Sequence, residues 1–116
     1  MNNLRGEFEI EVLGKKVGCM LTLNALRMFS QAEGVKLEEF DKFLKSDPLD
    51  ALPMLAYYGY LNKRLKTQAK GKSVPKELFV SEVLDSNDIE LVAGYIADAM
   101  NNDLDKDKSG NVKGAK

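Results

Sequence analysis

The first patterned segment of the chain, residues 6–13, alternates strictly between apolar and acidic side chains. One side of an extended chain would carry Phe8, Ile10 and Val12, and the other would carry Glu7, Glu9 and Glu11. This two-residue period predicts a half-buried β-strand, because successive side chains of a strand point to opposite faces.

A two-residue turn at Gly14-Lys15 would fold the next residues back as a second strand. In that register the facing pairs are Val12 with Val17, Ile10 with Cys19, and Phe8 with Leu21. All six apolar side chains then share one face, which must pack on helices because a lone hairpin is marginal in water. We therefore predict that Cys19 is a small buried apolar residue rather than a nucleophile.

Helical periodicity predicts three helices between residues 22 and 69. The first is capped by Thr22 or Asn24 and runs to about Glu33, with Gly34 as a left-handed stop. A short second helix carries Leu37, Phe40, Phe43 and Leu44. The third is the longest and extends to about Ala69, with Asp47 as N-cap and Pro48 as its first residue. Pro53 predicts either a kink in this helix or a true start near Leu52.

Two further helices are predicted over residues 74–85 and 89–100, with Asn87 capping the last one. The fold class is therefore α+β and predominantly α-helical: an N-terminal β-hairpin packed on about five helices, in a single domain of residues 1–101.

Residues 102–116 have almost no large apolar side chains and are predicted to be a disordered tail. Residues 105–112 match the start of an EF-hand loop, but Lys116 replaces the final glutamate, so we expect no calcium site.

Composition narrows the classes of function. The 116 residues include no histidine and one cysteine, which excludes Ser-His-Asp and Cys-His catalysis and an internal disulfide. We therefore expect no enzyme, no cofactor and no metal site. No apolar run approaches the ~20 residues of a membrane helix, and Met1-Asn2-Asn3-Leu4-Arg5 does not begin a signal peptide. The expectation is a cytoplasmic protein with no membrane partner.

The formal net charge of −1 hides two opposed blocks. Residues 63–76 contain six basic residues and no acid, and residues 77–105 contain eight acids and no base. The simplest interpretation is two solvated faces, and the functional one is a polar docking surface for another protein. The candidate partner-binding residues are Lys63, Arg64, Lys66, Lys70, Tyr57 and Met54.

Nucleic acid is a weaker interpretation of the same basic stretch. Tyr57, Tyr58 and Tyr60 precede it and would be able to stack on single-stranded bases. Helical spacing, however, places Tyr58 and Tyr60 in the core stripe of the third helix, and the sequence pI of about 5.5 is low for a nucleic-acid binder.

Three runs near the N-terminus carry a family resemblance: Gly6-Glu7-Phe8-Glu9-Ile10, Gly14-Lys15-Lys16 and Leu21-Thr22-Leu23-Asn24-Ala25-Leu26-Arg27. They resemble tail assembly chaperones of long-tailed phages and gene transfer agents, in which a short hairpin is followed by several helices. The resemblance implies a phage or prophage protein that has no catalytic residues. It implies binding to the tape-measure protein, which is thereby kept soluble, and help in recruiting tail-tube protein.

The same resemblance implies action in the bacterial host cytoplasm and absence from the mature virion. A helical, apolar-striped partner would suit binding as a helix in a groove. Two alternatives remain open: a small structural component of the tail or virion, and a nucleic-acid-binding regulator using residues 63–76. Self-association also remains open.

Overall fold

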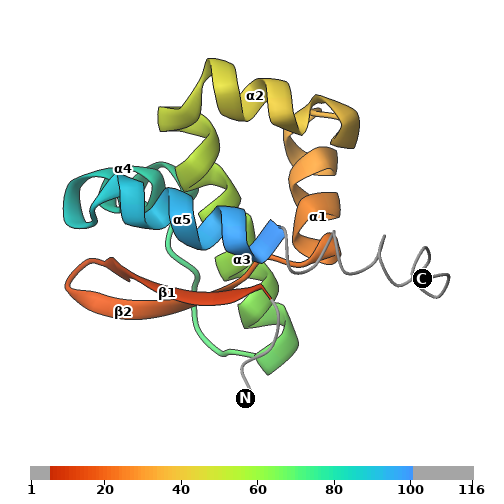
Figure 1. Ribbon diagram of the computed structural model, residues 1–116. Coiled ribbons are helices and arrows are strands. Elements are labelled where there is room, and N and C mark those ends of the chain that lie inside the picture. Colours follow the sequence, from red (N-terminus) through yellow and green to blue (C-terminus); the bar gives the residue numbers. More distant parts are fainter. Residues whose placement is uncertain (1–5, 101–116) are drawn as a thin grey trace, which may run out of the picture.

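The computed structural model describes residues 6–100 and has the expected α+β, mostly helical fold (Figure 1). Its elements are β1 (Glu7–Val12), β2 (Lys15–Met20), α1 (Leu23–Glu33), the 3₁₀ turn η1 (Leu37–Glu39), α2 (Phe40–Ser46), α3 (Pro48–Thr67), α4 (Lys76–Ser86) and α5 (Ile89–Met100). The two strands form an antiparallel hairpin. The predictions of one N-terminal hairpin and five α-helices are confirmed within this part of the chain. Those for residues 102–116, including the EF-hand-like segment, lie outside the described residues.

The faces of the hairpin are as predicted, but the predicted register is wrong by two residues. Val12 pairs with Lys15, Ile10 with Val17 and Phe8 with Cys19, in place of Val17, Cys19 and Leu21. The turn is Leu13-Gly14, whose φ angles of 55° and 76° are both positive, as a type I′ turn requires. A shift of two residues keeps every side chain on its own face, so Ile10, Val12 and Cys19 are still buried.

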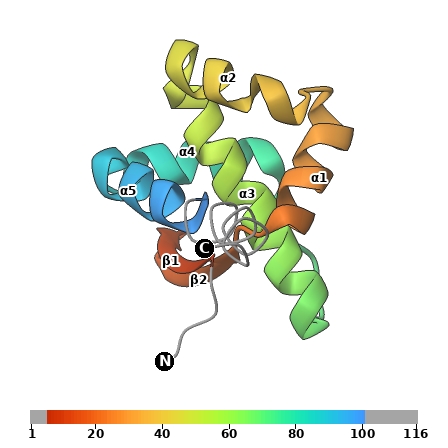
Figure 2. The same cartoon turned by 45° about the vertical axis from the view of Figure 1, so that its right-hand side comes forward.

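Helix α3 is the centre of the fold, and it contacts β2, α1, α2, α4 and α5 (Figures 1 and 2). It packs closely against the hairpin at Gly59, where an added Cβ would lie 3.3 Å from the Cβ of Cys19. Cys19 is buried, as predicted, and burial raises the pKa of its thiol far above the ordinary value. The largest fully buried side chains of the core include Phe29, Phe79, Leu21, Leu26, Leu55 and Ile96.

The predicted helix ends are confirmed where the signal is local. Thr22 is the N-cap of α1, and Gly34 ends it with a φ of 73°. Helix α3 begins at Pro48, so the alternative start near Leu52 is wrong. The first turn is already closed before Pro53, because the carbonyl of Asp47 accepts the N–H groups of two residues of that turn. The predicted start of the fourth helix at Val74 is wrong: α4 begins at Lys76, after Pro75, which disfavours a helical residue before it.

An interhelical hydrogen-bond cluster ties α1, α3 and α4 together. One carboxylate oxygen of Glu33 accepts the Tyr58 hydroxyl at 2.6 Å and the Lys76 ammonium at 2.7 Å. The hydrogen bonds from Lys76 and Tyr58 hold the pKa of Glu33 below its usual value. Lys76, the last cation of the basic stretch, therefore forms an ion pair within the fold.

Candidate protein-binding groove

The basic stretch does not form one binding surface. Lys63 pairs with Glu7 at 2.6 Å. Arg64 donates to the carbonyl of Gly71 at 2.6 Å and lies 5.8 Å from the ring centroid of Tyr60. Lys66 and Lys70 are exposed on the end of α3 and the loop after it. Two of the four candidate cations are therefore committed to contacts within the fold, a use that no local sequence signal reveals.

The two remaining candidate residues, Met54 and Tyr57, are half-buried on α3 and pack against the core. Tyr57 makes ring contacts with Tyr58 and Phe79. Tyr58 and Tyr60 are buried, as the stripe of apolar positions predicted. The structure therefore does not gather the six predicted residues into one site.

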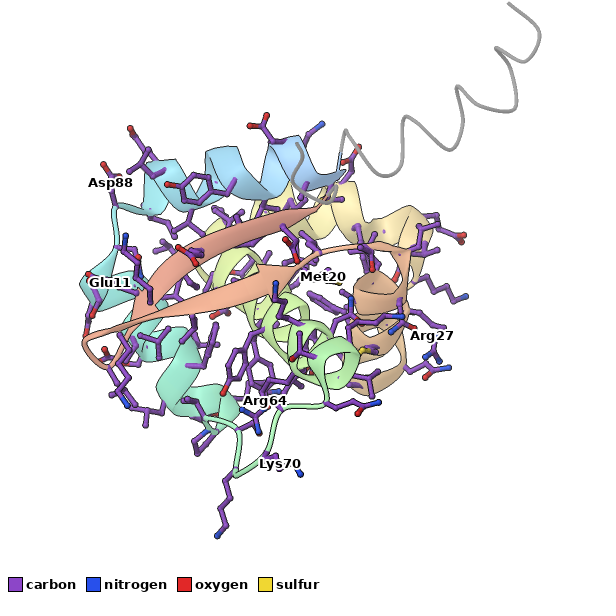
Figure 3. The ribbon with its side chains drawn as sticks, turned by 90° about the horizontal axis from the view of Figure 1, so that it is seen from below. Glu11, Met20, Arg27, Arg64, Lys70 and Asp88 are labelled. Atoms are coloured by element: carbon purple, nitrogen blue, oxygen red, sulfur yellow. The ribbon has the colours of Figure 1, made fainter. Side chains whose placement is uncertain are left out.

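A groove of about 780 Å³ lies instead along β1, between the hairpin and the first half of α5. Helix α5 contacts β1 and lies alongside it in Figures 1 and 3. Figure 3 places Glu11 and Asp88 at one end of the hairpin, away from Arg64 and Lys70. The groove is thus a different surface from most of the basic stretch, of which Lys63 alone is part of its lining.

Asn87 joins the α4–α5 connection to β1. Its Oδ1 accepts the backbone N–H of Glu11 at 2.9 Å, and its Nδ2 donates to the Glu11 carbonyl at 2.8 Å. The amide thus takes the place of a neighbouring strand at one residue. The prediction that Asn87 caps α5 is wrong, because Asp88 Oδ1 accepts the N–H of Glu90 at 3.0 Å instead.

The rest of the β1 edge is open. The backbone of Glu11 points away from β2, and the two-residue repeat of a strand turns the N–H and C=O of Glu9 and Glu7 the same way. Within residues 6–100, Glu9 has no backbone hydrogen-bond partner. An open edge of this kind is a template for another strand.

Exposed apolar side chains accompany this edge. Leu91 is 56% exposed and Tyr95 39% exposed, although both lie on a helix that packs on the core. The Tyr95 ring stacks on Phe8 with 5.7 Å between centroids. Apolar surface next to unpaired backbone is typical of a site that another chain covers.

Acidic groups line the same groove. Glu7 is neutralised by Lys63, whereas Glu9 and Glu11 have no ion-pair partner among the described residues. Asp88, at the end of the groove near Asn87, is a third carboxylate with no ion-pair partner among the described residues. The lining also carries two cations: Lys63, and Lys16, which lies opposite Glu11 in the hairpin. From the sequence alone, these glutamates were placed only on the side of the strand opposite its apolar residues. The sequence pattern predicted only two strands, and a two-stranded hairpin has an unpaired outer edge on each strand. The open edge of β1 could therefore have been predicted from the sequence.

Several residues of the runs that resemble tail assembly chaperones take part in the junction between the hairpin, α1 and α3. The N–H of Leu21 donates to the carbonyl of Gly6 at 2.8 Å. Asn62, which is fully buried, donates to the Met20 carbonyl at 2.9 Å and to Thr22 Oγ1 at 3.0 Å. Its Oδ1 accepts Nδ2 of Asn24 at 2.8 Å. Sequence analysis did not identify Asn62, because its partners are about forty residues away along the chain.

Comparisons with family models, with curated proteins and with solved structures found no match to this chain. The resemblance to tail assembly chaperones therefore stays a prediction. No helix within residues 6–100 combines the length and apolar character needed to cross a membrane. Over the same residues, no three acidic or cysteine side chains are grouped closely enough to hold a metal ion.

Proposed function

We propose that this chain is a non-enzymatic assembly chaperone of a phage or prophage tail. It binds the tape-measure protein in the host cytoplasm, keeps it soluble, helps to recruit tail-tube subunits, and is absent from the mature virion. Two independent features support this proposal: the groove along β1 and the resemblance of residues 6–27 to tail assembly chaperones.

The observation that carries the proposal is the exposed apolar wall of the groove. Leu91 and Tyr95 lie beside the open edge of β1, so the groove offers both apolar contact and unpaired backbone to a partner chain. A chaperone needs such a surface, since its client aggregates through exposed apolar segments. A regulator that binds nucleic acid is less well supported, because Lys63, Arg64 and Lys76 are engaged inside the fold.

Co-expression with the tape-measure protein of the same phage tests this function. We expect the wild-type chain to move that protein from the insoluble to the soluble fraction. Leu91→Lys should abolish the effect, because it places a charge on the apolar wall. Leu49→Lys is the matched control: Leu49 is similarly exposed, at 59%, and lies at the start of α3 outside the groove.

The control variant should solubilise the tape-measure protein as well as the wild type, and both variants should keep the wild-type melting temperature. A tape-measure protein that stays insoluble with the wild-type chain would contradict the proposal. A second arm reverses the charges of Lys66 and Lys70. Retardation of nucleic acid at physiological salt that this reversal abolishes would favour the regulator instead.

A further inference from the structure

The edge of β1 has the features of a site for strand addition. We propose that it accepts an extended segment of a partner protein as a third strand, with basic side chains at alternate positions and apolar side chains between them. The inference deepens the proposed function and rests on it only in taking the groove as the binding surface. It specifies the backbone conformation and the side-chain pattern of the bound segment.

The backbone argument concerns Glu7 and Glu9. Their N–H and C=O groups point into the groove, and Asn87 already forms this kind of pairing one step along, at Glu11. An extended chain can continue that pairing toward the start of β1. A helix cannot, because its own backbone groups are already hydrogen-bonded to one another. The structure therefore favours an extended partner over the helix in a groove that the sequence analysis expected.

The side-chain argument gives the two faces of the bound segment. On the glutamate face, Glu9 and Glu11 are exposed carboxylates with no ion-pair partner among the described residues. A lysine or arginine side chain directly across from Glu9 would be favourable. Glu11 already faces Lys16 of β2, and Asn87 holds its outer backbone groups, so a basic side chain would reach Glu11 only from the diagonal position. On the other face, Phe8, Tyr95 and Leu91 offer apolar contact. A strand that alternates basic and apolar residues satisfies both faces at once.

The same glutamates argue against a second copy of this chain as the occupant. The outward backbone groups of β1 belong to the residues that carry the glutamates. Two β1 edges paired in antiparallel fashion would therefore set glutamate directly opposite glutamate, which is destabilising. Like charges of this kind keep an edge from pairing with itself while leaving it open to a basic partner.

A synthetic hexapeptide with alternating lysine and valine is a direct probe. The full chain, labelled for NMR, is titrated with this peptide and with a peptide of the same composition that has three lysines followed by three valines. We expect saturable shifts and slowed hydrogen exchange at the amides of Glu7 and Glu9 with the alternating peptide. The reordered peptide should bind at least about tenfold more weakly, because it cannot match both faces.

Two variants at one position separate backbone from charge. Glu9→Pro removes an N–H that points away from β2, so the hairpin ladder is kept, and the affinity for the alternating peptide should fall at least about tenfold. Glu9→Gln keeps the N–H and should weaken binding less, with a smaller dependence on salt. If the proline variant fails to fold, hydrogen exchange at Glu7 and Glu9 of the wild-type chain and the comparison of the two peptides still test strand addition.

Equal binding of both peptides would overturn the proposal, as would shifts that leave Glu7 and Glu9 unchanged. A dimer that forms without peptide and protects the Glu9 amide would show that a second copy is the occupant. Solubilisation of the tape-measure protein that is lost in Leu91→Lys but kept in Glu9→Pro would leave the chaperone function standing without strand addition. Peptide binding at Glu9 without solubilisation would leave the strand site without that function.

Discussion

Two asparagines hold the two strands of the hairpin, and they do so in opposite surroundings. Asn62 is fully buried and satisfies Met20, Thr22 and Asn24 at the end of β2. Asn87 is partly exposed; it bonds to both backbone groups of Glu11, on the outer edge of β1, and its Nδ2 also donates to the Val83 carbonyl of α4 at 3.3 Å. The first closes a junction that water cannot reach. The second holds Glu11 and leaves the outward backbone groups of Glu9, two residues earlier, as an edge that a partner can use.

The difference is one of energetic consequence as well as location. A buried polar group that loses its partner has no water to replace it, whereas an exposed one does. We therefore expect substitutions at the Asn62 junction to act on folding. Substitutions at Asn87 should act mainly on how readily the outer edge of β1 exchanges its amide hydrogens and binds a partner strand.

Asn62→Ala should lower the free energy of unfolding by about 3–4 kcal/mol, because it removes the side-chain donor to the buried Met20 carbonyl, leaves Asn24 Nδ2 with only the weak acceptor Met28 Sδ, and opens a small cavity. Chemical denaturation followed by circular dichroism measures the change. Asn62→Asp, which has the same shape but lacks the donors, should be no better tolerated. A loss below about 1 kcal/mol would mean that the junction is open to water.

Gly6 lies on the other side of the same junction and gives the second prediction. Its φ is +83°, and an added Cβ would lie 2.6 Å from the carbonyl oxygen of Leu21. Gly6→Ala should therefore lower the melting temperature clearly, at a cost of about 2–3 kcal/mol.

Gly14→Ala provides the matched control for Gly6→Ala. Gly14 also has a positive φ, of 76°, but an added Cβ there would meet no atom within 4 Å. Only the left-handed backbone conformation is penalised, by about 1 kcal/mol. Thermal unfolding of the two variants side by side separates steric contact from conformation. Equal losses would mean that the contact with Leu21 relaxes without cost.

These contrasts also show which parts of the structure local sequence can predict. The alternation from Glu7 to Val12 predicted the strand and its faces, and Gly34 predicted the end of α1, because each signal lies within a few residues of its effect. The register was missed because Leu13, a residue that seldom adopts positive φ, takes the first turn position. The pairing of the whole hairpin therefore favours a turn at Leu13-Gly14 over the predicted turn at Gly14-Lys15.

The candidate site was predicted less well than the fold, and for a physical reason. The charge of Lys63 is plain in the sequence, but its partner Glu7 is 56 residues away, and Asn87 bonds to Glu11 across 76 residues. Such contacts exist only after the chain has folded. Charge counting therefore pointed to the basic stretch. A two-stranded hairpin implies an outer edge on β1, but where that edge is closed depends on the tertiary contact of Asn87 with Glu11.

The smallest expected effect belongs to Asn87→Ala. It removes the two hydrogen bonds to Glu11, but water can reach both backbone groups, so the free energy of unfolding should fall by about 0.5–1 kcal/mol. Its main effect should be on the outer edge of β1.

Hydrogen exchange of the Glu11 amide should accelerate, while that of the Ile10 amide, which points to β2, should stay slow. The open edge then extends from Glu9 to Glu11, so the alternating lysine–valine peptide should bind more tightly than it does to the wild type. Weaker peptide binding in Asn87→Ala would mean that the Asn87 clamp is needed to hold the edge in shape, and the contrast between the two asparagines would then be one of degree rather than of kind.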